Sequence, residues 1–568
     1  MTRSFLPFFG IFLMGWTSAV WAQSPSGDKP PVTLPTSKML TVPPPGRIGS
    51  TNSFPATMAL SPDGRYAALL NGGYGTQDTL GKQSISVLDL KTNQIADYPD
   101  ARLGEEAHQS YFLGLAFSSD GKLLYASVGS LTDPTGETAG DMGNGIAVYS
   151  FSDGKVAPEK IIPIALQPLS TGKKLASGLK APPGTAIPYP AGLTVIADGG
   201  RDKLLIANNL SDNVVLVDAA SGKILQTFDL STSDLVPSSF PYTVVATRDG
   251  RRAWCSLWNA SQAAELDLTR GKVARWIKLK QPEDPLAPGT HPTAMLLSPD
   301  EKTLYVALSN VDQIAAVSTS SGEPFQFFTT TPPAQKYAGS YPTALAQSSN
   351  GKHLFAADSS MDAVAVFDLA QSGSSSDPQT PQAATGFIPT DWYPSALAVH
   401  GDDLLIATAK GEGTGPNKDM GKTPHETKHH GHLYIATLLR GSIARVPIPP
   451  SLERLPQLTQ VVERDNLLHS DPGTISFAGG KNPFKHVIYV IKENRTYDQI
   501  LGDLKVGDGD ASLTMYGEDI TSNEHKLALQ FGVLDNFYDS GEVSGDGHLW
   551  STAAITSDYN EKTWQIAY

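Results

Sequence analysis

The stretch TAMLLSPDEKTLYVALSNVDQIAAVS, residues 293–318, decides the fold. Two apolar runs, 293–297 and 304–308, flank the turn sequence SPDE, and a third, 314–317, follows the polar segment SNVDQ. Short runs rich in β-branched and aromatic residues between turn formers are typical of antiparallel strands. The stretch therefore predicts three short strands in succession.

Segments with the same pattern recur along the chain with a period near fifty residues. A wider interval in the series predicts a surface insertion near residues 155–190. Seven units of about four short strands each predict an all-β, seven-bladed β-propeller over residues 51–448, because a closed ring protects its sheet edges. The turn of each unit is marked by one residue: Asp63, Asp120, Asp202, Asp249, Asp300, Asn350 and Asp402.

Two of these units carry a more specific signature. The segments IANNLSDNVVLVD, residues 206–218, and YVALSNVDQIAAV, residues 305–317, resemble the YVTN family of β-propeller repeats, which occurs in exported bacterial proteins. The resemblance covers about 400 residues and implies a fold, whereas a propeller alone does not define a function.

The composition excludes several classes of protein. The chain has 568 residues, of which 40% are hydrophobic and 18% charged, so it is neither mostly disordered nor a multi-span membrane protein. A net charge of −14 argues against a nucleic-acid partner. One cysteine, Cys255, excludes a disulfide framework and a cysteine-based metal cluster, and its apolar strand predicts that it is buried.

The N-terminus has the features of a secretory signal peptide, residues 1–22. Arg3 precedes a short apolar core, and Val20-Trp-Ala22 offers a small-residue cleavage site. The Pro-rich residues 23–50 predict an extended or disordered linker. The apolar core is short for a membrane anchor, and no later segment is apolar enough, so we expect a periplasmic or secreted protein without a transmembrane segment in its mature chain.

The repeat pattern ends near residue 448. Residues 449–484 predict a linker with a short helix, and residues 485–568 have an α/β pattern. The continuous apolar run 487–491 predicts a buried parallel strand, and the capping box from Thr496 to Gln499 predicts a helix after it. A second strand is predicted at 527–534, followed by a Gly-rich loop and a helix over 549–557. Such a loop at a helix N-terminus suits a phosphate.

Together these motifs resemble the phosphoesterase family of the alkaline-phosphatase superfamily. The resemblance rests on two segments: ENRTYDQILG, residues 493–502, and VSGDGHLW, residues 543–550. It implies that Glu493 and Asn494 hold a divalent metal, that Ser544 is the nucleophile, and that His548 contacts the phosphoryl group or the leaving oxygen. Arg495 either contacts phosphate or pairs with a neighbouring carboxylate.

The resemblance covers only the N-terminal part of that domain. Family members continue for several hundred residues and complete the metal site with later Asp and His residues. We therefore expect an incomplete phosphoesterase domain in residues 485–568 and little phosphatase activity, which leaves open whether the chain itself is an enzyme. The first hypothesis is an exported, metal-dependent phosphoesterase that acts through a phosphoseryl intermediate, with the propeller as its binding module. The alternative is a non-enzymatic propeller that binds a ligand or a protein through its loops.

Overall fold

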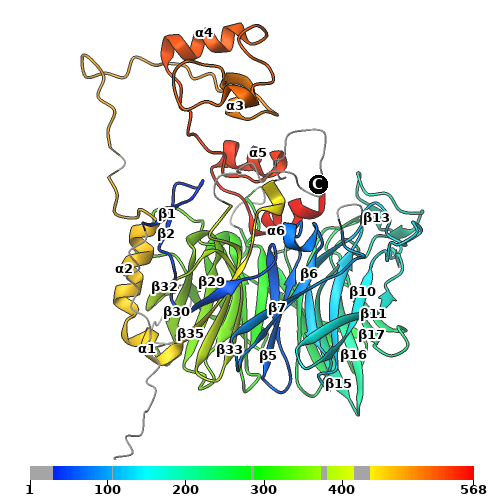
Figure 1. Ribbon diagram of the computed structural model, residues 1–568. Coiled ribbons are helices and arrows are strands. Elements are labelled where there is room, and N and C mark those ends of the chain that lie inside the picture. Colours follow the sequence, from blue (N-terminus) through cyan, green and yellow to red (C-terminus); the bar gives the residue numbers. More distant parts are fainter. Residues whose placement is uncertain are drawn as a thin grey trace, which may run out of the picture.

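The computed structural model describes residues 30–104, 107–282, 287–371, 380–414, 435–471 and 473–567. The predicted signal peptide, residues 1–22, lies outside these ranges. Seven antiparallel sheets of four main strands each form a ring (Figure 1), which confirms the predicted seven-bladed β-propeller. Among the described residues, no helix is long and apolar enough to cross a membrane.

The first four blades run outward from the strand nearest the ring axis. Blade 1 contains β4 (Pro55–Leu60), β5 (Tyr66–Asn71), β6 (Ser84–Asp89) and β7 (Gln94–Pro99); blade 2 contains β8 (Ser110–Phe117), β9 (Leu123–Gly129), β10 (Gly145–Ser152) and β11 (Lys155–Pro163); blade 3 contains β15 (Pro190–Asp198), β16 (Arg201–Asn208), β17 (Asn213–Asp218) and β18 (Ile224–Asp229); blade 4 contains β20 (Pro241–Ala246), β21 (Arg252–Leu257), β22 (Gln262–Asp267) and β23 (Lys272–Lys278).

The last three blades differ in how their outer strands are supplied. Blade 5 contains β24 (Pro292–Leu297), β25 (Thr303–Leu308), β26 (Gln313–Ser318), β27 (Pro324–Thr329) and the short β31 (Gln382–Ala383); blade 6 contains β28 (Pro342–Gln347), β29 (His353–Asp358), β30 (Ala363–Asp368) and β32 (Gly386–Pro389); blade 7 contains β33 (Trp392–His400), β34 (Asp403–Gly411), β35 (Ser442–Pro447) and β3 (Arg47–Ser50).

The ring is closed by the N-terminal strand β3. It pairs antiparallel with β35 and forms the outer strand of blade 7, so the two ends of the propeller sequence share one sheet. The ring therefore includes four residues that the sequence analysis placed in the linker 23–50. Their pattern is too short to be recognised as a strand without its partner.

The blades pack against one another through apolar side chains. Most of the strand residues that face a neighbouring blade are buried, including Cys255 on β21, which is fully buried as predicted. Small and branched residues such as those of 204–207 and 214–217 fill the space between sheets. This close packing is what gives the ring a fixed shape on which loops can hold a site.

The remaining described elements are short. The strands are β1 (Val32–Thr33), β2 (Met39–Leu40), β12 (Gln167–Pro168), β13 (Lys174–Leu175), β14 (Thr185–Ala186) and β19 (Leu235–Val236); the 3₁₀ helices are η1 (Gln77–Thr79), η2 (Ser309–Val311), η3 (Ser359–Met361), η4 (Leu369–Gln371), η5 (Ile435–Thr437) and η6 (Ala511–Leu513); the α-helices are α1 (Ile448–Glu453), α2 (Leu455–Asp465), α3 (Tyr497–Leu501), α4 (Ser522–Phe531), α5 (Ser544–Ala553) and α6 (Asp558–Ala567).

The predicted linker 449–484 is in part a packed helical segment. α2 lies against β32, where Leu455, Leu458 and Val462 are buried in the cores of the neighbouring blades. The approach is close: a Cβ added at Gly386 would lie 2.6 Å from Leu455 Cγ. Helices α1 and α2 thus belong to the rim of the propeller (Figure 1).

The predicted α/β core of residues 485–568 is wrong in the region that the structure describes. The run 487–491 is not a strand, and its side chains are 46–88% exposed. The second predicted strand, 527–534, overlaps α4 instead. A parallel strand needs neighbouring strands and covering layers, and residues 473–567 contain none. The capping box of Thr496 and Gln499 is confirmed at the start of α3.

Figure 1 shows two different placements in the C-terminal part of the chain. α3 and α4 stand away from the ring at the end of an extended connection. α5 and α6, in contrast, lie over one face of the ring, which we call the top face. The top face is where the predicted nucleophile loop meets the propeller.

Candidate functional site

Ser544 lies at the first residue of α5, after an extended Val543. The loop before it is compact: a Cβ added at Gly541 would lie 2.4 Å from the amide nitrogen of Gly547. Glycine is therefore required there by backbone contact rather than by flexibility. The loop delivers a half-buried Ser544 hydroxyl to the N-terminal end of a ten-residue helix.

Two of the residues predicted from different motifs are in contact. Glu493 Oε2 lies 2.7 Å from His548 Nε2, and both side chains are about half exposed. His548 is four residues after Ser544 on α5, so the two side chains lie on the same helix face. The structure thus brings two of the five predicted site residues into contact and places a third, Ser544, one helical turn away.

Asn494 and Arg495 are directed differently. Both are exposed, and the Arg495 Nη1 donates to the carbonyl oxygen of Asn494 at 2.6 Å. The Arg495 guanidinium lies 5.7 Å from the centre of the Tyr516 ring. These contacts are within the segment of α3 and α4 and do not involve the Ser544 helix.

The metal that the resemblance implies has only part of a site in the described residues. Glu493 and Asn494 would supply oxygen ligands, which suit a hard divalent cation. In the described ranges, however, no group of three His, Cys, Asp or Glu side chains that could share an ion includes Glu493. The residues present do not fit a complete metal site, so no reaction step is assigned to a metal.

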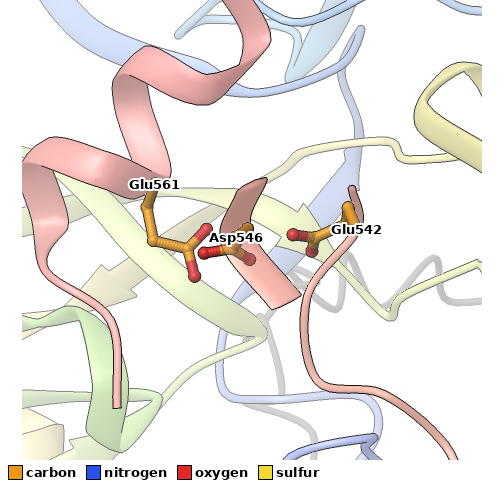
Figure 2. A group of neighbouring side chains, drawn as sticks. All are labelled: Glu542, Asp546 and Glu561. Atoms are coloured by element: carbon orange, nitrogen blue, oxygen red, sulfur yellow. The ribbon is translucent and has the colours of Figure 1, made fainter. Parts of the chain in front are cut away.

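A group of three carboxylates does occur beside the nucleophile loop. Ligand atoms of Glu542, Asp546 and Glu561 all lie within 4.8 Å of one another, and Figure 2 shows the three side chains converging. The cluster contains a cation from the protein itself: Lys410 Nζ on β34 lies 2.6 Å from Glu542 Oε1 and 2.7 Å from Glu561 Oε2.

Burial governs the ionisation of this cluster. Withdrawal from water raises the pKa of Glu561 to about 8 and that of Asp546 to about 6, while the positive charge of Lys410 acts in the opposite direction on both. Burial alone would lower the pKa of Lys410, but attraction to Glu542 and Glu561 outweighs it and raises that pKa. The lysine is therefore charged, and the Asp546 and Glu561 carboxyl groups hold their protons to a higher pH than usual.

A second polar group attaches α6 to the top face. The hydroxyl of Tyr393 donates to Asp558 Oδ1 at 2.7 Å, and the Lys562 ammonium pairs with Asp558 Oδ2 at 2.8 Å. The Tyr559 hydroxyl donates to Asn209 Oδ1 at 2.7 Å. Residues from blades 3 and 7 thus hold the same helix.

A cavity of about 430 Å³ lies between the top face and the C-terminal helices. Its walls come from the N-terminal segment, from blades 5 to 7, and from the ends of α2 and α5. Representative lining residues are Lys38, Asp362, Trp392, Tyr393, Asn466 and Trp550. Burial raises the pKa of Asp362 to about 7. The volume and the mixture of aromatic and charged walls suit a small polar ligand.

Sequence reasoning missed both the Lys410 cluster and this cavity. The available signal for Lys410 was its position: a lysine directly after the apolar strand residues 404–409. Its partners are distant in sequence, and a strand-end lysine is ordinarily solvated.

Comparisons with known proteins agree with the ring. Residues 270–391, from the outer strand of blade 4 to the start of blade 7, match the family described as "Lactonase, 7-bladed beta-propeller". No curated protein matches the sequence of the chain.

Solved structures with similar backbones share little sequence. Hydrazine synthase of Kuenenia stuttgartiensis has 14% identity, a TM-score of 0.43, and coverage of 63% of this chain and 93% of that one. Virginiamycin B lyase of Staphylococcus aureus has 12% identity, a TM-score of 0.42, and coverage of 70% and 98%. The periplasmic gluconolactonase of Pseudomonas aeruginosa has 19% identity, a TM-score of 0.42, and coverage of 60% and 86%.

Fold and family match together define the class. The chain is a seven-bladed β-propeller, and its matched stretch is of the lactonase type. The structural similarities are too low to carry an argument about what it binds.

Proposed function

We propose that this protein is an exported hydrolase of phosphate esters, whose reacting group is Ser544 and whose propeller is the module that carries and supports the site. The observation that supports it best is the 2.7 Å contact between Glu493 and His548, with Ser544 one helical turn away. A nucleophile, a base and a carboxylate that orients the base form a recurrent hydrolytic arrangement.

The proposed reaction uses these three side chains. The Ser544 hydroxyl oxygen attacks phosphorus, and its proton passes to His548. The bond from phosphorus to the ester oxygen breaks, and the leaving alcohol takes that proton back from His548. Water then cleaves the phosphoseryl ester and regenerates Ser544. Glu493 stabilises the His548 imidazolium, and the positive end of the helix dipole at the start of α5 favours the anionic phosphoryl oxygens.

Three further features belong to the proposal. A divalent metal, with Glu493 and Asn494 as candidate ligands, would neutralise charge on the phosphoryl oxygens when bound. Arg495 would serve phosphate binding only if the α3 segment moved toward Ser544. The predicted signal peptide, residues 1–22, supports export to the periplasm or the medium.

A single-turnover experiment tests the function. The chain from Gln23 onward is incubated with p-nitrophenyl phosphate, with and without Mg²⁺, Mn²⁺ or Zn²⁺, and analysed by peptide mass spectrometry. We expect one phosphoryl group on Ser544, no label in Ser544→Ala, and labelling slowed at least about 100-fold in His548→Asn. Ser551→Ala, on the same helix, is the matched control and keeps the label. Absence of label under every condition, or its persistence in Ser544→Ala, contradicts the proposal.

The cavity favours a second candidate, a propeller that binds a small ligand without turnover. It rests on the volume of about 430 Å³ and on the buried Asp362 in its wall. The lactonase match over residues 270–391 makes lactones and their hydroxy acids reasonable first probes. Quenching of tryptophan fluorescence by D-gluconate or glucono-δ-lactone, lost in Asp362→Ala, would support it; no change with either probe would count against this ligand class.

A further inference from the structure

Lys410 is a propeller residue whose charge is balanced by the C-terminal segment. Its side chain is 1% exposed, and its two carboxylate partners, Glu542 and Glu561, are nearly as buried. The ammonium also lies 4.8 Å from the centre of the Trp392 ring and 5.4 Å from that of Tyr393. A buried ammonium is costly unless such partners are in place. The top face is therefore built to receive the C-terminal segment.

The partners of Lys410 are located on both sides of the nucleophile. Glu542 precedes Ser544 by two residues, and Glu561 lies on α6, after the helix that Ser544 begins. Within the cluster, the Asn560 side chain donates to Asp546 Oδ1 at 2.7 Å and so joins α6 to the first turn of α5. Lys410 thus holds both the chain that precedes Ser544 and α6, the helix that is packed against the first turn of α5.

The other contacts of α6 do not depend on Lys410. Asp558 accepts a hydrogen bond from the hydroxyl of Tyr393 in blade 7, and the Tyr559 hydroxyl donates one to Asn209 in blade 3. The Tyr559 ring also packs against Trp258, with 4.5 Å between ring centres. Removal of the Lys410 charge should therefore leave α6 docked and loosen the loop that leads into Ser544.

We propose that Lys410 is a positioning residue for Ser544, so that the propeller is a structural part of the reacting site and not only an appended binding module. The proposal rests on the function proposed above, since it assigns Lys410 a role through Ser544. The resident cation of the carboxylate cluster is then the lysine ammonium, which is held by the fold at a set distance from the nucleophile loop.

Hydrogen exchange tests the positioning independently of catalysis. In Lys410→Met, which keeps the length of the side chain but not its charge, we expect amides of residues 540–548 to exchange at least about tenfold faster, while the blade strands stay protected. Lys410→Arg keeps the charge and should restore most of the protection. Lys302→Met, at an exposed turn, is the control and should match the wild type.

The single variant Glu542→Gln covers the case in which Lys410→Met fails to fold, and a double-mutant cycle applies where both variants fold. Glu542→Gln weakens the same contact from the other side and should loosen the same residues. The double variant should then be no looser than the worse single variant, because both remove one interaction. Unchanged exchange at 540–548 in both single variants, or fully additive effects, overturns the positioning role.

The rate of Ser544 phosphorylation by p-nitrophenyl phosphate is a second measurement. It should change if Lys410 positions Ser544 and stay the same if Lys410 has only a structural role. We expect the rate in Lys410→Met to fall at least tenfold at saturating substrate and to recover in Lys410→Arg. A rate unchanged in Lys410→Met despite a loosened loop overturns the role in positioning. A wild type that never labels at Ser544 overturns the phosphoesterase function, and the exchange experiment then still decides whether Lys410 anchors the loop.

Discussion

Glu561 is the carboxyl group whose ionisation is most closely tied to docking of the C-terminal segment. It is 3% exposed, and burial raises its pKa to about 8, against an ordinary value of 4.5. The groups that face it are Lys410 of β34 and Glu542 and Asp546 of the nucleophile loop and α5. One ammonium balances one carboxylate, so a further ionised carboxyl in this cluster buries an uncompensated charge. Because the docked Glu561 carboxyl keeps its proton to a higher pH than the undocked one, the contribution of Glu561 to docking is fully present below about pH 4.5 and is lost as the pH rises through about 8.

This direction of the pH dependence gives a prediction for the wild type and for Glu561→Gln. Between pH 5.5 and pH 8.5 the wild-type C-terminal segment should become several-fold more susceptible to a protease, as more docked molecules must bury a charge. Glu561→Gln stays neutral throughout and should lose most of this dependence. The measurement is the cleavage rate within 540–567, divided by that of the glutamine variant at the same pH, which removes the pH dependence of the protease itself. A ratio that stays constant, or that falls as the pH rises, contradicts the assigned cause.

At the residue scale, the sequence could indicate the proposed reacting group, Ser544, but not the residues that support it. Ser544, His548 and Glu493 belong to two short motifs, and the structure places two of them in contact. Lys410 was not identified because its role depends on Glu542 and Glu561, which contact it only in the folded chain. An ion pair between a blade and a distant helix leaves no local pattern in the sequence.

At the scale of elements, an aspartate recurs in the turns between blades. The repeat pattern includes this aspartate, but the role of its carboxylate is seen only in the structure. Asp312, which is 1% exposed, ends η2 with a left-handed φ of 52°. Its carboxylate accepts hydrogen bonds from the amides of Gly339, Ser340 and Tyr341 at 2.7, 2.9 and 3.1 Å. Tyr341 itself has a φ of 54°. One side chain thus joins blade 5 to the first strand of blade 6.

Replacement of Asp312 should therefore destabilise the ring far more than its place in a turn implies. Asp312→Ala leaves three amide donors without their acceptor and puts alanine at a left-handed φ, so we expect a loss of about 3 kcal/mol or more in the free energy of unfolding. Asp312→Asn keeps an acceptor oxygen and tolerates that φ, so its loss should be about 1 kcal/mol. Chemical denaturation measures both, with Asp300→Ala at an exposed turn as the control. Equal effects of the alanine and asparagine variants would show that the hydrogen bonds are not the cause.

Among the strands, sequence patterns predict some elements correctly and others wrongly. The blade strands were predictable because the sequence of each blade alternates between apolar runs and turn-forming segments, and because this pattern repeats seven times. The run 487–491 has the same apolar character, yet its side chains are exposed. Apolarity indicates a tendency to form a buried strand, but a strand exists only where another strand supplies its hydrogen bonds.

For the whole molecule, the decisive contact is the one that closes the ring. β3 completes blade 7 by pairing with β35, and the chain before β3 also packs on the top face. In that segment Leu34, Leu40 and Val42 are 4%, 1% and 7% exposed. Residues 30–50, which composition alone assigned to a Pro-rich linker, are therefore part of the folded body.

Removal of this segment should open the ring at one seam. A chain that begins at Thr51 lacks the outer strand of blade 7 and three buried apolar side chains, each worth about 1.5–3 kcal/mol when withdrawn from water. We expect its midpoint of thermal unfolding to fall by about 5 °C or more relative to a chain that begins at Pro30. A chain that begins at Pro30 but carries Gly49→Pro is the sharper comparison, because proline disturbs the pairing of β3 with β35 and leaves the apolar contacts in place. If the loss is due to strand pairing, this variant should reproduce part of it; if it melts like its parent while the shortened chain does not, the apolar segment and not β3 closes the propeller.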